Sequence, residues 1–323
     1  MREQGKNLVI LDAGDALFSP KAIKASRSKS NLLKAKTIVH GYERIGCDAF
    51  NVGTHDLALG FEFIDSLQAS TNLPFISANI VEKESGELIF KPYIIIKKGE
   101  LKIGVIGLTD KIPAIAAGLR ILDYKKTGVE YITKLQPQVD ILVMLVNANR
   151  QDYGNLKVEF NAADYIFVSR YTGRTYPSSH QLEDGPFLYS VGVQGKWVAE
   201  IDLSIVDPRK PIIDISQSQE NLKTVEKRFK SLKQRNPDKV LEDIYVDKPN
   251  VLKIIKDYRV KQEKAEKILA NAVNRSEYRL TALDKKIADD PELVKLAKET
   301  LSECRKLDRI TSQTLKKVRN QPS

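Results

Sequence analysis

The stretch YERIGCDAFNVGTHDLALG, residues 42–60, reads as the end of a helix, a short buried strand and a polar loop. The strand is expected at 48–52, where the residues are mostly apolar and the run is short. The loop that follows carries Thr54, His55 and Asp56, and a short helix comes next. A buried strand that is followed at once by polar residues and a helix is typical of a layered α/β protein.

The same alternation continues on both sides of this stretch. Apolar runs predict strands, and Lys98-Gly99-Glu100 has the composition of a tight hairpin turn. The strands are expected at 7–11, 48–52, 75–79, 93–98, 101–108, 141–146, 165–168, 187–191 and 197–205. Between these strands, apolar residues at helical spacing predict helices. The expected fold is therefore α/β (α+β), a β-sandwich flanked by helices. Ligands of such sheets bind at the strand C-termini, so we expect the functional loops at 13–18, 53–60, 147–150 and 169–174.

The composition changes near residue 219. All 17 glycines precede this position, and residues 219–323 carry 26 Lys and Arg against 17 Asp and Glu, a net charge of +9 out of +10 for the chain. Apolar residues recur there at three- and four-residue spacing, and Asp290-Pro291 has the composition of a helix start. The predicted domains are therefore 1–206 as the α/β domain, 207–218 as a linker, and 219–323 as an α-helical, coiled-coil-like arm. The expected stripe includes Leu222, Val225, Phe229, Leu280, Leu283, Leu301 and Cys304.

Several classes of site lack their sequence signals. The chain has three histidines, His40, His55 and His180, and it has no Walker or GxGxxG pattern. Its two cysteines are far apart, which argues against a disulfide framework. On the basic arm, Lys and Glu are interspersed and aromatic residues are sparse, so nucleic-acid binding is not favoured.

Residues 7–206 resemble the calcineurin-like metallophosphoesterases, particularly their bacterial 5′-nucleotidase branch. The resemblance rests on stretches that occur in the family's order, with sensible spacing. They are Leu11–Asp15, Tyr42–Gly60, Pro74–Val81 (PFISANIV), Ile103–Leu108 (IGVIGL), Val139–Val146, Ala163–Thr172 and Tyr189–Leu203 (YSVGVQGKWVAEIDL). This family resemblance implies the sandwich fold and a two-metal phosphoesterase centre.

The resemblance also implies a metal centre that has lost most of its ligands. Asp15 matches the family's bridging carboxylate, and the opening Asp-x-His has no counterpart in the sequence as given. The other ligand positions carry Thr54, Asn147, Arg170 and Thr172. One ligand in seven therefore survives. Thr and Asn are poor substitutes for the family's ligands, and a guanidinium would repel divalent cations.

The resemblance assigns residual roles to two residues of the first loop. His55 matches a histidine that contacts phosphate or acts as a general acid, with Asp56 orienting it. For His55, a loop histidine that serves packing or hydrogen bonding is the simpler interpretation. Without metals, Arg170 is expected to neutralise Asp15 through a direct or water-bridged contact.

Two functions follow as alternatives. The first is a catalytically inactive scaffold without a cofactor, which binds a protein partner or a second copy through 219–323. The second is a phosphatase or 5′-nucleotidase that uses a divalent metal (Mn, Zn, Co or Mg) at an atypical site. No apolar run approaches the length of a membrane span. The sequence as given shows no export signal, which suggests the cytoplasm, whereas the family suggests an exported protein with a longer N-terminus.

Overall fold

The structure is a computed structural model that describes residues 7–19, 23–179, 181, 185–234 and 236–319. The chain divides into two compact units. The first comprises Met1–Arg174, Gly185–Lys196 and Leu283–Ser323, and the second comprises Thr175–Asp184 and Trp197–Ala282.

The main sheet of the first unit has the strand order β10-β9-β8-β6-β5. Its strands are β5 (Tyr93–Lys98), β6 (Leu101–Thr109), β8 (Ile141–Asn147), β9 (Tyr165–Ser169) and β10 (Phe187–Tyr189). The neighbours from β6 to β10 are parallel, and β5 pairs antiparallel with β6 through the predicted hairpin. Every residue of β8 is buried, as its continuous apolar sequence predicts for a central parallel strand.

A second sheet packs face to face with the first. Its three parallel strands are β1 (Leu11–Asp12), β2 (Ala49–Asn51) and β3 (Phe75–Ile76). A separate antiparallel pair is formed by β4 (Ile80–Glu82) and β7 (Leu119–Ile121). The sheets approach closely at Gly107, where a Cβ atom would lie 2.5 Å from the Asn51 side chain and 2.9 Å from Ile76. The expected sandwich is therefore present.

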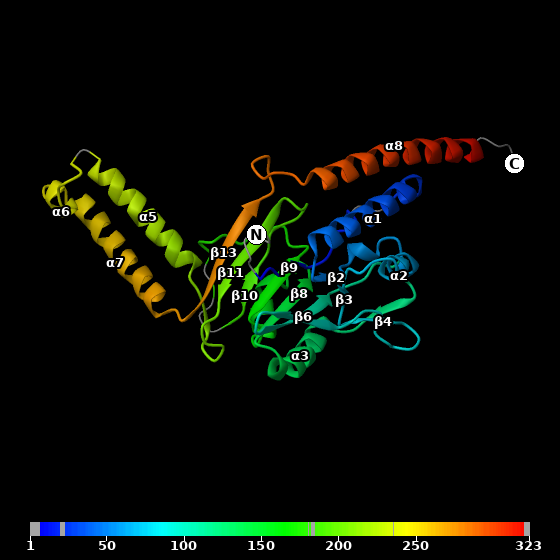
Figure 1. The fold of residues 1–323 in the computed structure, drawn as a ribbon, viewed down its shortest axis with the longest axis horizontal. Helices are drawn as coiled ribbons and strands as arrows, with labels where there is room; N and C mark the ends of the chain where they lie inside the picture. Colours follow the sequence, from blue (N-terminus) through cyan, green and yellow to red (C-terminus); the bar gives the residue numbers. More distant parts are fainter. Residues whose placement is uncertain (1–6, 20–22, 180, 182–184, 235, 320–323) are drawn as a thin grey trace. The chain divides into compact units, whose positions relative to one another are not determined.

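Helices cover both sheets (Figure 1). The helices α1 (Ser28–Ile45) and α2 (Phe61–Ala69) contribute buried residues to the core of the β1–β3 sheet. The helices α3 (Tyr124–Leu135) and α4 (Leu156–Glu159) contribute to the core of the main sheet. Asp123 caps α3 by accepting hydrogen bonds from two backbone N–H groups of its first turn.

The last helix belongs to the first unit. Helix α8 (Pro291–Arg319) begins at the predicted proline and lies antiparallel along α1 (Figure 1). Thr300 contacts Thr37 with 2.9 Å between the hydroxyl oxygens, and the Cys304 thiol donates to the carbonyl of Ser30. Its buried face therefore includes Thr300 and Cys304, whereas Leu301 of the expected stripe is 48% exposed.

The second unit contains a small sheet in the order β11-β13-β12 and a helical hairpin. Its elements are β11 (Trp197–Ser204), β12 (Ile212–Asp214), α5 (Ser216–Lys233), α6 (Leu241–Ile244), α7 (Pro249–Asn271) and β13 (Asn274–Ala282).

These elements correct the expected domain boundaries. The interval 207–218 contains a strand, and 219–323 is not one helical arm, because β13 is the central strand of a sheet and α8 joins the other unit. Leu280 therefore lies in a strand instead of a heptad. The segment 274–282 alternates between inward and outward residues, a period of two that the search for helical spacing missed.

Candidate functional site

The site residues come from five loops, each at the C-terminal end of a parallel strand. Parallel strands end at one edge of their sheet, so polar residues that are distant in the sequence converge there. The contributions are Asp15 after β1, Thr54–Asp56 after β2, Asp110 after β6, Asn147 at the end of β8, and Ser169 and Arg170 at the end of β9.

Asp15 holds His55 through two hydrogen bonds. Its Oδ1 accepts from the backbone N–H of His55 at 2.7 Å, and its Oδ2 lies 2.6 Å from the imidazole Nδ1. The side chains of Asp15 and His55 are 10% and 23% exposed. Asp15 has a φ of 68°, in the left-handed region that non-glycine residues rarely adopt, and such strain is concentrated at functional sites.

Asp56 stabilises the loops instead of orienting the imidazole. Its fully buried carboxylate accepts from the backbone N–H groups of Asp15 at 2.8 Å, Gly53 at 2.8 Å and Leu17 at 2.9 Å. Burial and, second, the negative charge of Asp15 raise the pKa of Asp56 well above its ordinary value. The expected contact between Asp56 and His55 is therefore replaced by the contact between Asp15 and His55.

Gly53 allows the first two loops to approach. A Cβ atom there would lie 2.5 Å from Asp15 Oδ1, 2.7 Å from Asp15 N and 2.8 Å from Asn147 Nδ2. Because no larger residue fits, the Asp15 carboxylate and the Asn147 amide can flank the same point of the backbone.

Arg170 points into the site and contacts Thr54 and Asn147, two of the other positions that the sequence analysis singled out. Its Nη1 donates to Thr54 Oγ1 at 2.5 Å and to Asn147 Oδ1 at 3.4 Å, and its Nη2 donates to Asp110 Oδ2. The predicted direct contact between Arg170 and Asp15 is replaced by another, because the carboxylate that pairs with the guanidinium is Asp110. The side chains of the pair are 12% and 8% exposed.

The remaining contacts close this network. Thr54 Oγ1 lies 3.0 Å from Asn147 Oδ1 and donates to the Lys111 carbonyl at 2.9 Å. The Asn147 amide donates to Ser169 Oγ, which donates in turn to the Ala13 carbonyl, each at 2.7 Å. Thr172, the fourth substituted position, is exposed and lies outside this network.

Asp110 was missed by the sequence analysis. It follows a predicted strand of the main sheet, at the edge where Asn147 and Arg170 lie, and this position is the signal that could have pointed to it. Its Oδ2 also accepts from Asn149 N at 3.1 Å, while its Oδ1 is buried without a hydrogen-bond partner in the structure. Unpaired buried oxygens are costly, so Asp110 depends on Arg170 for compensation.

These donors do not fit a two-metal centre. Within the described residues, no group of three or more His, Cys, Asp or Glu side chains is arranged to hold a metal ion. Two matched positions carry a neutral hydroxyl and a neutral amide, and a third carries a permanent positive charge. His40, on α1, lies 3.9 Å from Glu43, and His180 lies outside the described residues.

The structure describes no helix that is long and apolar enough to cross a bilayer.

Comparison with known proteins gives several relatives, although no family model matches the chain. The 5′-nucleotidase of Vibrio cholerae is 29% identical over 174 residues, which are 52% of this chain and 30% of that protein. Protein UshA of Salmonella pullorum is 34% identical over 107 residues, 33% of this chain and 18% of that protein. The chain thus aligns with under a third of the length of either relative.

Solved structures share the fold. The calcineurin-like phosphoesterase YfkN of Bacillus subtilis has a TM-score of 0.61 and 15% identity, and the similarity covers 95% of this chain and 87% of that one. The sulfate thiohydrolase SoxB of Thermus thermophilus has a TM-score of 0.53 and 21% identity, over 62% of this chain and 37% of that one. The likeness to YfkN extends over nearly the whole chain, so it includes most of the region that was expected to be a separate helical arm.

Proposed function

We propose that this chain, which is similar to 5′-nucleotidases and shares the fold of a calcineurin-like phosphoesterase, is a non-catalytic member of that family. In this proposal the α/β unit is a scaffold, and the helical hairpin of the second unit binds a protein partner. Family resemblance favours an exported location for such a scaffold, which cell fractionation would test.

The observation that carries the proposal is the closed network around Arg170. Three positions that match metal ligands, Thr54, Asn147 and Arg170, bond to one another and to Asp110. A guanidinium cannot donate an electron pair to a metal, and its charge opposes the approach of a divalent ion. Two-metal hydrolysis requires cations that polarise the phosphoryl oxygens and activate water, and the guanidinium occupies the oxygens that could hold such a cation.

The alternative is a metal-dependent phosphatase with an atypical site. The pair of His55 with Asp15 favours it, because a partly exposed imidazole that is held by a carboxylate can contact phosphate or transfer a proton. That alternative requires Mn²⁺, Zn²⁺, Co²⁺ or Mg²⁺ to bind beside Arg170. The positive charge of the Arg170 guanidinium opposes such binding.

Metal content and hydrolysis together test the proposal. We expect the purified wild-type protein to contain less than one equivalent of divalent metal. It should not hydrolyse nucleoside monophosphates above background with added Mn²⁺, Co²⁺ or Zn²⁺. Enzymatic turnover that Asp15→Ala and His55→Ala both abolish would refute the non-catalytic function.

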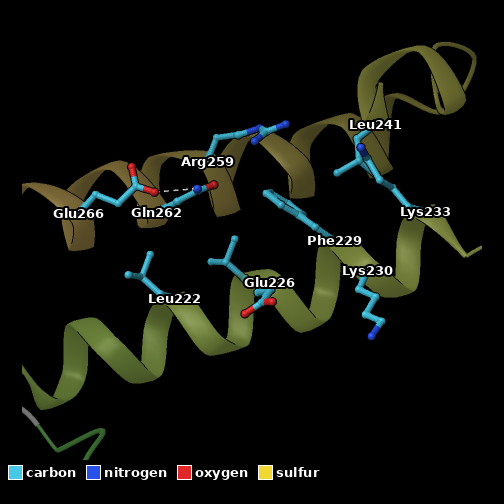
Figure 2. A pocket seen from close by; sticks show the side chains of 10 residues that line it. Leu222, Glu226, Phe229, Lys230, Lys233, Leu241, Arg259, Gln262 and Glu266 are labelled. Atoms are coloured by element: carbon cyan, nitrogen blue, oxygen red, sulfur yellow. Dashed lines mark hydrogen bonds between the residues drawn. The ribbon is translucent and has the colours of Figure 1, made fainter. Parts of the chain in front are cut away.

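The proposed partner surface is a groove of about 510 Å³ between α5 and α7. In Figure 2, Leu222 and Phe229 point into the space between the two helices. Lys230, Lys233 and Arg259 are among the lining residues, and the Arg259 guanidinium lies 4.8 Å from the Phe229 ring centroid. Residues 216–271 carry 14 Lys and Arg against 9 Asp and Glu, a net charge of +5. The lining also includes Glu226 and Glu266, so its cations outnumber its acids by three to two. Apolar lining residues on a hairpin of net positive charge favour an acidic amphipathic segment as the occupant.

Matched charge reversals on α5 test this surface. Lys230→Glu with Lys233→Glu should weaken binding of a labelled acidic amphipathic peptide at least tenfold in fluorescence anisotropy. Lys223→Glu with Lys227→Glu changes the charge equally outside the groove and should have a much smaller effect. Equal loss in both variants would indicate nonspecific attraction. Light scattering of the same variants would show whether a second copy is the occupant instead.

A further inference from the structure

We infer that the guanidinium of Arg170 is the resident cation of the former metal pocket, and that its removal uncovers an oxygen-lined site for a divalent cation such as Mn²⁺. This inference rests on the proposed non-catalytic function. It adds a specific cause, namely that the positively charged Arg170 side chain occupies the pocket and excludes metal ions.

The oxygens around Arg170 form the first line of evidence. The guanidinium contacts Thr54 Oγ1 at 2.5 Å, Asn147 Oδ1 at 3.4 Å and the Asp110 carboxylate. These acceptors come from the ends of three different strands and converge on one positive group. A hydroxyl, an amide carbonyl and a carboxylate are the ligand types that hard divalent cations accept.

The balance of charge is the second line of evidence. Asp110 is 8% exposed, and its Oδ1 is buried without a hydrogen-bond partner in the structure, so a second acceptor atom is free beside the guanidinium. Asp15 lies near the same point, since a Cβ atom on Gly53 would contact both its carboxylate and the Asn147 amide. Without Arg170 the pocket would therefore hold one uncompensated carboxylate, that of Asp110, whereas Asp15 keeps its contact with His55.

The backbone of Arg170 is the third line of evidence. Its φ is 64°, in the left-handed region, although a non-glycine residue is strained there. The conformation persists because the side chain is held by its three partners. The guanidinium is thus fixed in the pocket and is not an exposed cation that happens to lie over it.

Four variants separate charge from shape. Arg170→Gln removes the charge and keeps most of the volume, Arg170→Ala removes both, and Arg170→Lys keeps the charge. Arg170→Gln combined with Asp110→Asn removes the proposed carboxylate ligand. Mn²⁺ binding is measured by electron paramagnetic resonance of the free ion and by the thermal shift with added Mn²⁺, and circular dichroism establishes that each variant is folded.

We expect Arg170→Gln or Arg170→Ala to bind one Mn²⁺ at least tenfold more tightly than the wild type. Arg170→Lys should stay like the wild type, and the Asp110→Asn combination should lose the gain. A folded Arg170→Gln protein with no gain over Arg170→Lys would overturn the inference while leaving the non-catalytic function intact. Tight Mn²⁺ binding by the wild type would overturn the inference by itself. Wild-type hydrolysis would refute the proposed function separately.

Discussion

Replacing Arg170 by alanine, in the absence of metal, is expected to lower the free energy of unfolding of the first unit by about 3 kcal/mol. Breaking a buried ion pair costs roughly 3–5 kcal/mol, because the remaining charge is left uncompensated. We take the lower end of that range for two reasons. Arg170 is 12% exposed, and Asp110 keeps its hydrogen bond from Asn149 N.

Asp110→Asn, alone and combined with Arg170→Ala, shows whether the lost stability comes from the ion pair between Arg170 and Asp110. Asp110→Asn should cost about 2 kcal/mol, because it removes the charge and keeps the shape. The double variant should cost about 3 kcal/mol, well below the roughly 5 kcal/mol that additive effects would give. The difference of about 2 kcal/mol is the coupling energy of the two side chains.

Urea and thermal denaturation provide the measurement. A loss of 3 kcal/mol corresponds to a decrease of about 6–12 °C in Tm for a unit of this size. Arg150→Ala is the matched control, because Arg150 is an exposed arginine in the loop after β8, and it should change stability by less than about 0.5 kcal/mol. Additive costs in the double variant, or an Arg170→Ala effect no larger than that of Arg150→Ala, would refute the reasoning.

Three further substitutions have expected outcomes. Gly53→Ala should destabilise the protein by about 3 kcal/mol or more, because its Cβ would lie 2.5 Å from a carboxylate oxygen, whereas Gly154→Ala, with nothing within 4 Å, should be nearly neutral in urea titration. Gly41→Ala, inside α1 and also without a neighbour within 4 Å, should raise Tm through about 0.5–1 kcal/mol of helix propensity, and a lower Tm would contradict this. The raised pKa of Asp56 means that the folded protein binds its proton more tightly than the unfolded chain, so this group's contribution to stability should fall as pH rises from about 4 through the folded pKa. Urea titrations over that pH range should show a smaller decline in the free energy of unfolding for Asp56→Asn than for the wild type. The same pH dependence in both proteins would exclude the effect.

The strands of the α/β unit were predictable because their signals are local. Continuous apolar runs such as 141–146 cannot be exposed, and polar residues at their ends mark the sheet edge where sites form. The hairpin at 98–100 and the helix start at Pro291 also depend on adjacent residues alone. In contrast, β13 was not predicted. Its residues were assigned to a helix with apolar residues every three to four positions, whereas buried and exposed residues alternate along it with a period of two.

Within the site, the sequence predicted which positions lie together but not which of them bond. Asp15 and Thr54 follow strands of one sheet, Asn147 and Arg170 lie at strand ends of the other, and the four residues do lie together. Which carboxylate Arg170 would contact depends on the direction of a long side chain that starts from a left-handed backbone, and no local pattern encodes that direction.

The sequence alone therefore determined the α/β class and the loops that form the site, because these depend on apolar runs and on the polar residues that follow them. Only the tertiary structure decided that Asp110 neutralises Arg170, that Asp15 holds His55 and that α8 packs on α1. Those outcomes depend on distances between segments that are up to hundreds of residues apart in the chain, such as the 263 residues that separate Thr37 from Thr300. The choice among several possible ionic partners is made by geometry and burial, since every carboxylate in a sequence attracts a guanidinium equally until the fold brings one of them within reach.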